Sequence, residues 1–185
     1  MIDPCILAID LGTTNCKTIL LDAECHIVAK RSVEYAVATP RPGWAEQDPH
    51  VWWEVVKESV RDMATVATPG AIQAIGISGQ MHGLVALNAQ GQVIRPAILW
   101  NDQRSAPQCD EIYALAGGRA GLCALTNNSM LPGYTGGKIL WLRQHEPEHY
   151  NALATIILPK DYIRYRLTGT LGTDVSDASG TGLFD

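Results

Sequence analysis

A short polar turn near the start of the chain brings together a carboxylate, a glycine, two hydroxyls and a lysine, in the sequence Asp10-Leu11-Gly12-Thr13-Thr14-Asn15-Cys16-Lys17. It follows the apolar run 6–9, which is typical of a strand buried on both faces. Gly12 lets the backbone approach a ligand closely. Exposed N–H groups of such a turn can hold a phosphate, and Asp10 can hold Mg²⁺, usually through water. An ordinary polar hairpin turn accounts for the same residues, so this motif alone does not distinguish a phosphate site from a structural turn.

A second polar segment, Gly79-Gln80-Met81-His82-Gly83, follows another apolar run at 74–78. Ligands of open α/β sheets bind at the carboxyl ends of the strands. Gln80 and His82 are neutral donors and acceptors, which suit hydroxyl groups, so a polyol or sugar fits better than an anion. The alternative for His82 is a structural histidine with satisfied hydrogen bonds.

A third segment, Trp100-Asn101-Asp102-Gln103-Arg104, also follows a short apolar run. An aromatic ring beside an amide, a carboxylate and a guanidinium is typical of a wall that binds carbohydrate. A purely structural salt bridge between Asp102 and Arg104 is the alternative.

Two matches to catalytic patterns fail on physical grounds. Residues 145–149 read His-Glu-Pro-Glu-His, the pattern of zinc proteases, but that site needs both histidines on one continuous helix. Pro147 interrupts such a helix. Gly137-Lys138 lacks the rest of a phosphate-binding P-loop, because Ile139 stands where serine or threonine is required.

The composition excludes several classes of protein. The chain has 185 residues, 46% of them hydrophobic and 18% charged, which favours a folded domain over a disordered segment. Its 14 basic and 19 acidic residues give a net charge of −5 without a basic stripe, so no nucleic acid partner is expected. No apolar run has the length of a membrane span. The five cysteines form no CxxC pair, which predicts reduced thiols and a cytoplasmic location.

The elements that position these motifs begin with three strands, at 6–9, 18–21 and about 26–35, joined as two hairpins. A helix is predicted from Asp48 as N-cap and Pro49 as first residue to about residue 69. Its apolar side chains are Trp52, Val55, Val56, Val60 and Met63, which lie on one face. The strand 74–78 follows. Three antiparallel strands, a helical crossover and a parallel fourth strand form the ribonuclease-H-like order. We therefore expect an α/β domain with a mixed sheet flanked by helices.

The remainder of the chain is predicted to contain both helices and strands. It should contain a hairpin of 84–87 with 93–94, a helix at 106–116, and a glycine-rich stretch through residue 121. A helix at 138–145, a strand at 155–158 and a helix at 159–167 complete the expected elements.

The ordered set of motifs resembles the amino-terminal domain of the FGGY carbohydrate kinases. The motifs are Ala8-Ile9-Asp10-Leu11-Gly12-Thr13-Thr14, Trp44-Ala45-Glu46-Gln47-Asp48-Pro49, Gly79-Gln80-Met81-His82-Gly83 and Leu99-Trp100-Asn101-Asp102. The likeness continues through Pro132-Gly133-Tyr134-Thr135, Leu158-Pro159-Lys160-Asp161-Tyr162 and the segment 173–180, so it covers residues 1–185. Within the family it is most similar to the members that act on D-xylulose.

The resemblance implies a pair of actin/hexokinase-like domains, with ATP and a sugar in the cleft between them. It places Asp10 near Mg²⁺ and the transferred phosphoryl group. Gly12, Thr13 and Thr14 would face the phosphates, and Lys17 would lie near the same charge. Gln80, Met81 and His82 would contact the sugar, and Trp100, Asn101 and Asp102 would line its pocket.

The activity implied is ATP-dependent phosphorylation of D-xylulose to D-xylulose 5-phosphate. Ribulose, gluconate and glycerol are the alternative substrates of such kinases. Gly133, where glycerol kinases carry an aromatic residue, favours a longer substrate. The partners are then a small sugar and ATP with Mg²⁺, and a homodimer is left open.

Family members are much longer than this chain. Their general-base aspartate and their second, adenine-binding domain lie outside the residues given. We therefore expect residues 1–185 alone to be inactive. A non-catalytic sugar-binding or interaction domain and an actin-like ATPase are the alternatives from other functional classes, and the Gln80-Met81-His82 segment argues against the ATPase.

Overall fold

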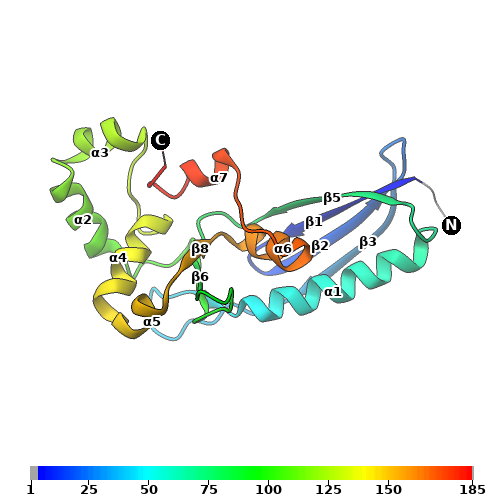
Figure 1. The fold of residues 1–185 in the computed structure, drawn as a ribbon, viewed down its shortest axis with the longest axis horizontal. Helices are drawn as coiled ribbons and strands as arrows, with labels where there is room; N and C mark the ends of the chain where they lie inside the picture. Colours follow the sequence, from blue (N-terminus) through cyan, green and yellow to red (C-terminus); the bar gives the residue numbers. More distant parts are fainter. Residues whose placement is uncertain (1–3, 185) are drawn as a thin grey trace.

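The computed structural model describes residues 4–184 and is built around a four-stranded sheet (Figure 1). The strands are β1 (Cys5–Leu11), β2 (Asn15–Leu21), β3 (Ile27–Glu34) and β5 (Ile72–Gly79), in the order β3-β2-β1-β5. β1 is antiparallel to β2 and parallel to β5, and β2 is antiparallel to β3. This arrangement confirms the predicted meander followed by a parallel fourth strand.

Helix α1 (Pro49–Val66) makes the crossover from the meander to β5 and lies along one face of the sheet (Figure 1). It starts as predicted, because the Asp48 carboxylate accepts a hydrogen bond from the His50 N–H at 2.9 Å and Pro49 occupies the first turn. Its buried face carries Trp52, Val56 and Met63. These side chains pack on the sheet and form most of the core with it.

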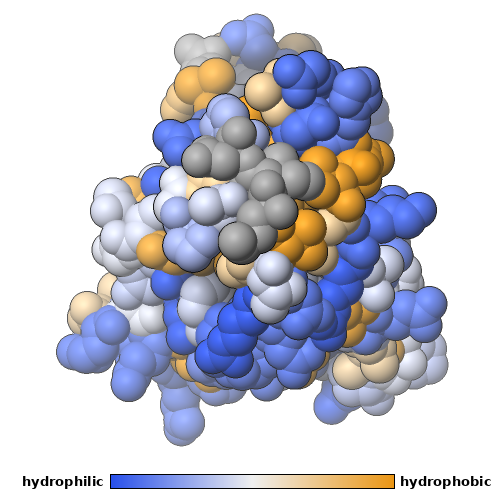
Figure 2. All heavy atoms as spheres, turned by 90° about the vertical axis from the view of Figure 1, so that its right-hand side faces the viewer, coloured by the Kyte–Doolittle hydropathy of each residue, from blue (hydrophilic) through white to orange (hydrophobic). Residues whose placement is uncertain are grey.

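The sheet is covered on one face only. The side chains of β1 alternate, so that Leu7 and Ile9 are buried in the core while Ile6 points to the other side and is 44% exposed. Ile75 pairs with Leu7 and therefore lies on the covered face, and it is 43% exposed because β5 is the edge strand. Figure 2 views the molecule from the end near the N-terminus and shows apolar side chains open to solvent there.

Smaller elements gather beyond the carboxyl ends of β1 and β5 (Figure 1). The two-residue strand β4 (Glu46–Gln47) pairs with β7 (Ala97–Ile98), and β6 (Val85–Leu87) pairs with β8 (Thr155–Ile157). The helices of this part are α2 (Ala106–Leu115), α3 (Arg119–Thr126), α4 (Thr135–His145), α5 (Pro147–Ala152), α6 (Pro159–Thr168) and α7 (Val175–Ser179). α6 packs between α1 and β5, and its Tyr162 and Ile163 belong to the main core.

Three local predictions are corrected. Residues 84–87 meet 93–94 through a single bridge, Leu87 with Val93, and the regular partner of β6 is β8 instead. Residues 119–126 form the helix α3 although Gly121 lies within it. The short helix α7 was not predicted. Its N-cap is Asp174, whose carboxylate accepts from the Asp177 N–H at 2.9 Å.

Other expectations are confirmed. α4 ends at His145 and α5 begins at Pro147, so the two histidines of the protease-like pattern do not share a helix. Within residues 4–184 no disulfide joins any of the five cysteines. Within residues 4–184, no helix combines the length and apolar character needed to cross a bilayer.

The one-sided sheet makes a testable contrast between two neighbouring residues of β1. We expect Ile6→Lys to change the free energy of unfolding by less than about 1 kcal/mol, because the new ammonium stays in water. Leu7→Lys should cost several kcal/mol and abolish the cooperative melt, because it buries an unpaired charge. Thermal melts followed by circular dichroism measure both. Equal destabilisation by the two changes would show that the Ile6 face is covered.

Candidate active site

Asp10, the last polar residue of β1, lies on the uncovered face of the sheet. The strand register places Lys17 of β2 and Ser78 of β5 beside it on the two sides. These three residues line a groove of ≈310 Å³ together with Ala8, Ile9, Ile19, Gly76 and Ile77. Within residues 4–184, no hydrogen bond or salt bridge engages the Asp10 carboxylate, which is exposed. The groove therefore offers an unoccupied carboxylate beside an exposed ammonium.

The turn that follows Asp10 is held from beneath by Tyr35. The Tyr35 hydroxyl donates to the Gly12 carbonyl at 2.6 Å, and the Tyr35 N–H donates to the Thr14 carbonyl at 3.0 Å. Burial raises the pKa of Tyr35, so its hydroxyl remains a donor. A Cβ on residue 12 would lie 2.9 Å from the Asn15 carbonyl oxygen, which explains the glycine. Thr13 is half-buried and Thr14 is exposed.

The Gln47 amide joins this turn to the second motif. Its nitrogen donates to the Thr13 carbonyl at 2.7 Å and the Ala36 carbonyl at 3.1 Å. Its oxygen accepts from the Gln80 side-chain amide at 3.0 Å and from the Trp52 indole at 3.1 Å. The Gln47 side chain thus uses both of its polar atoms, and it fixes the two motifs relative to each other.

Gln80 itself is buried, and its backbone N–H donates to the Leu11 carbonyl at 2.7 Å. Its side-chain oxygen is buried without a hydrogen-bond partner. Met81 is half-exposed beside it. This oxygen is compatible with the prediction that Gln80 offers a polar group to a ligand.

His82 adopts a left-handed backbone conformation, with φ of 59°. Its ring lies 4.5 Å, centroid to centroid, from that of Tyr134, and its Nδ1 is buried without a hydrogen-bond partner. Burial, and to a lesser degree the charge of Lys138, lowers the pKa of His82. At neutral pH the ring is therefore uncharged, with one nitrogen a donor and the other an acceptor.

Trp100 stands between the first and second motifs. Its indole N–H donates to the Thr13 hydroxyl at 2.9 Å, and the side chain is partly exposed. Residue 133 packs against its backbone, since any Cβ there would overlap the Trp100 carbonyl oxygen. The partly exposed indole forms a wall next to the Asp10 turn, and Gly133 packs against the backbone of Trp100.

Asp102 is engaged inside the protein. Its Oδ2 accepts a hydrogen bond from Nη2 of Arg104 at 2.7 Å and another from the Ala45 N–H at 2.6 Å. Both side chains are buried. In this structure Asp102 forms the salt bridge that the sequence left as the alternative, whereas its neighbour Asn101 is exposed.

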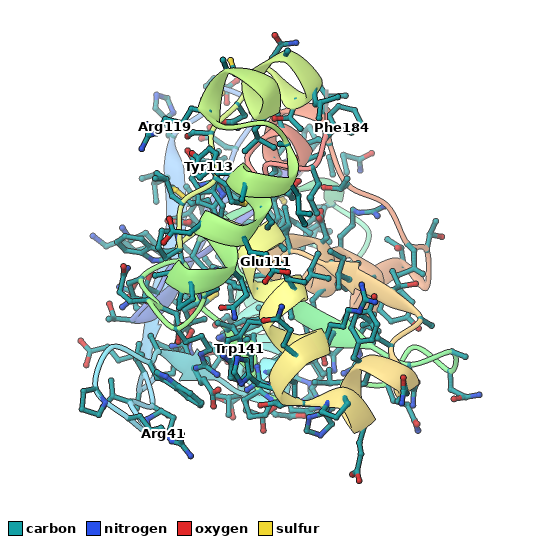
Figure 3. All side chains as sticks on the ribbon, turned by 90° about the vertical axis from the view of Figure 1, so that its left-hand side faces the viewer. Arg41, Glu111, Tyr113, Arg119, Trp141 and Phe184 are labelled. Atoms are coloured by element: carbon teal, nitrogen blue, oxygen red, sulfur yellow. The ribbon has the colours of Figure 1, made fainter. Side chains whose placement is uncertain are left out.

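The ion pair continues into a buried network beneath Trp100. Glu46 accepts from Arg104 at 2.7 Å and from Arg95 at 2.5 Å. The Arg104 guanidinium lies 3.7 Å from the ring centroid of Trp44, and Trp44 meets Trp141 edge to face at 5.3 Å. Figure 3 shows Trp141 pointing from α4 toward the long connection between β3 and α1. Figure 3 also shows Glu111 of α2 next to α4, where it accepts from Gln144 at 2.7 Å.

Lys138 was not predicted as a site residue, yet it is fully buried beneath the second motif. Its ammonium donates to the His82 carbonyl and to the Gly133 carbonyl, both at 2.8 Å. Burial lowers the pKa of Lys138 to about 7. In the sequence, the only hint was a lysine between Gly137 and the apolar Ile139.

Comparison with known proteins matches residues 5–185 to the FGGY family of carbohydrate kinases, N-terminal domain. A xylulose kinase of Escherichia coli K12 is 41% identical over 179 residues, which are 97% of this chain and 36% of that protein. The crystal structure of a xyloylose kinase from Brucella ovis superimposes with a TM-score of 0.90 at 38% identity, covering 97% of this chain and 38% of the other. A crystal structure of gluconate kinase from Lactobacillus acidophilus superimposes with a TM-score of 0.89 at 32% identity, covering 97% of this chain and 36% of the other.

The buried Lys138 predicts a pH dependence of stability. Its pKa of about 7 in the fold lies below the value of 10.5 for a free side chain. Between these values the unfolded chain holds the proton more tightly, so stability rises with pH. We therefore expect the free energy of unfolding of the native chain, relative to that of Lys138→Met, to increase by about 1 kcal/mol per pH unit above pH 7.

Urea unfolding at intervals from pH 6 to pH 9 measures this difference. Asp102, Arg104, Cys109 and His82 face Lys138 and are present in both proteins. Because Lys138 also lowers the pKa of His82, the comparison relies on the range above pH 7, where His82 is neutral in both proteins. A difference that stays constant across this range would contradict a proton-linked Lys138.

Proposed function

The chain belongs to the FGGY family of carbohydrate kinases, and we propose that the full-length protein transfers the γ-phosphoryl group of MgATP to a hydroxyl of D-xylulose, forming D-xylulose 5-phosphate. The chain spans 36% of the length of its E. coli relative. The general base and the adenine site are therefore assigned to the remainder of the full-length protein. The lack of disulfides among the described residues supports a reducing, cytoplasmic setting for the proposed enzyme.

The Asp10 turn fits the phosphate side of this reaction. A bound MgATP would supply the phosphoryl group and the metal charge that stabilises its transfer. Asp10 is free to hold the metal through water, because no protein group occupies its carboxylate among the described residues. Lys17 provides a positive charge from the neighbouring strand. Gly12, Thr13 and Thr14 present backbone and hydroxyl donors at the same turn.

The second and third motifs fit the sugar side. The neutral His82, the buried oxygen of Gln80 and the exposed Met81 form a surface that mixes hydrogen-bonding and apolar groups. Trp100 supplies an aromatic face of the kind on which a sugar carbon chain packs. Asn101 is an exposed amide at its rim. We give Asp102 a positioning role, since it anchors the backbone around Trp100.

The hydrogen bond between Trp100 and Thr13 carries the proposal. The Trp100 indole nitrogen lies 2.9 Å from the Thr13 hydroxyl, which supports a sugar pocket next to a phosphate-binding turn. A phosphoryl donor and a hydroxyl acceptor held by these two segments would meet at the Asp10 groove. Phosphoryl transfer depends on this kind of positioning together with electrostatic stabilisation.

A second substrate class has specific support in the likeness to the gluconate kinase structure. The neutral pocket weighs against gluconate, because neither His82 nor Gln80 offers a positive charge to a carboxylate. We therefore place the uncharged ketopentose first.

Substrate preference tests the proposal. We expect the full-length protein to release ADP with D-xylulose in preference to gluconate, ribulose and glycerol, measured in a coupled assay at equal concentrations. Residues 1–185 alone should give a cooperative melt but no turnover, since half a cleft leaves both substrates largely solvated. Preference for glycerol, or turnover by residues 1–185 alone, would overturn this account.

Asp10→Asn in the full-length protein tests the phosphate side separately. The change removes one charge next to the metal and the transferred group, and we expect turnover to fall at least about a hundredfold with an unchanged melting temperature. Asp110→Asn is the matched control, because Asp110 is an exposed carboxylate on α2. Turnover of Asp10→Asn within about tenfold of the native enzyme would remove Asp10 from the catalytic residues.

A further inference from the structure

We propose that Lys138 is a positioning residue for the sugar, whose ammonium ties the His82 loop to the Gly133 loop and so fixes the sugar-binding surface. This inference rests on the proposed function, because it assigns to the sugar side a residue that does not touch the sugar. It concerns only how firmly that side is held.

The geometry of Lys138 is that of a clamp between two loops. Its ammonium reaches the carbonyls of His82 and Gly133, which are 51 positions apart in the sequence, at 2.8 Å each. The Thr135 hydroxyl donates to the same His82 carbonyl at 3.1 Å. Two donors from the first turns of α4 therefore hold one backbone oxygen of the sugar loop.

The ammonium has no carboxylate to neutralise it. Within residues 4–184 no salt bridge includes Lys138, although Asp102 is near enough to favour its charged form. A buried cation without a paired anion is costly, and an apolar side chain of the same length would fill the space without that cost. What the lysine adds is the link between the two carbonyls.

The link matters because His82 needs support. A histidine at φ 59° occupies a sparsely populated region of backbone conformation, which persists when surrounding contacts hold it. Holding its carbonyl fixes the orientation of the ring against Tyr134. The same ammonium holds Gly133, which packs on the backbone of Trp100. Lys138 therefore positions both walls of the sugar pocket.

Among the described residues, Lys138 makes no hydrogen bond to the Asp10 turn. The turn is held by Tyr35 and by Gln47, which lie on other elements. Loss of the clamp should therefore weaken the sugar while leaving MgATP nearly unaffected. A general loss of structure would affect both substrates.

The test compares two buried side chains of α4 in the full-length enzyme. We expect Lys138→Met to raise the KM for D-xylulose at least tenfold and to change the KM for MgATP less than twofold. Leu142→Ala is the control, because Leu142 is fully buried on the same helix but packs in the cluster of Leu84 and Ile98. It should lower the melting temperature and leave both KM values within twofold.

Thr135→Val keeps the test decisive if Lys138→Met does not fold. It removes one donor from the His82 carbonyl without a change of shape, and we expect a two- to fivefold rise in the KM for D-xylulose alone. Equal effects on the two substrates, or no effect of either variant on the sugar, would overturn the clamp. A native enzyme inactive toward D-xylulose would instead overturn the proposed function.

Discussion

One buried side-chain amide, that of Gln47, sets the geometry on which the rest of the site depends. It is the only group among the described residues that bonds both the turn after β1, through the Thr13 carbonyl, and the segment after β5, through Gln80. The two strands are neighbours and parallel, so their ends already lie side by side. The Gln47 amide then fixes the distance between the loop after β1 and the loop after β5. Moving either loop away would leave a buried polar group without its hydrogen bond, which costs free energy. The turn after β1 and the start of the loop after β5 are in this way joined at Gln47.

Around Gln47, other polar groups are buried in pairs and networks. Asp102, Arg104 and Glu46 hold the connection that carries Trp100, and Lys138 holds the loop that carries His82. Asp10 and Lys17, by contrast, are exposed. The site therefore has a stiff buried frame and an open polar rim, which suits a reaction that depends on positioning. The groove of Asp10 lies on the uncovered face of the sheet.

The central fold could be predicted from the sequence because the patterns that indicate it arise within single elements or between neighbouring ones. The apolar run before Asp10, the Asp48-Pro49 helix start and the spacing of Trp52, Val56 and Met63 each reflect contacts within one element or between neighbours. The pairing of β6 with β8 could not be predicted in this way, since its residues are about seventy positions apart and both strands have only three residues. The same reason hid Lys138 and Ser78, whose importance comes from what the fold places next to them. Asp102 was predicted to line the sugar pocket, and only the fold shows that Arg104 and Ala45 engage both of its oxygens.

The most direct test of this account is the specificity constant, kcat/KM, of Gln47→Leu in the full-length enzyme, measured for D-xylulose and for MgATP. Trp52→Phe is the matched control, because it removes one donor from the Gln47 oxygen and keeps the bonds to Thr13 and Gln80. The account predicts that Gln47→Leu lowers both constants at least about thirtyfold, or 2 kcal/mol of transition-state stabilisation, whereas Trp52→Phe changes them less than about threefold. Contradiction would come from a Gln47→Leu enzyme that loses stability as Trp52→Phe does but retains both specificity constants.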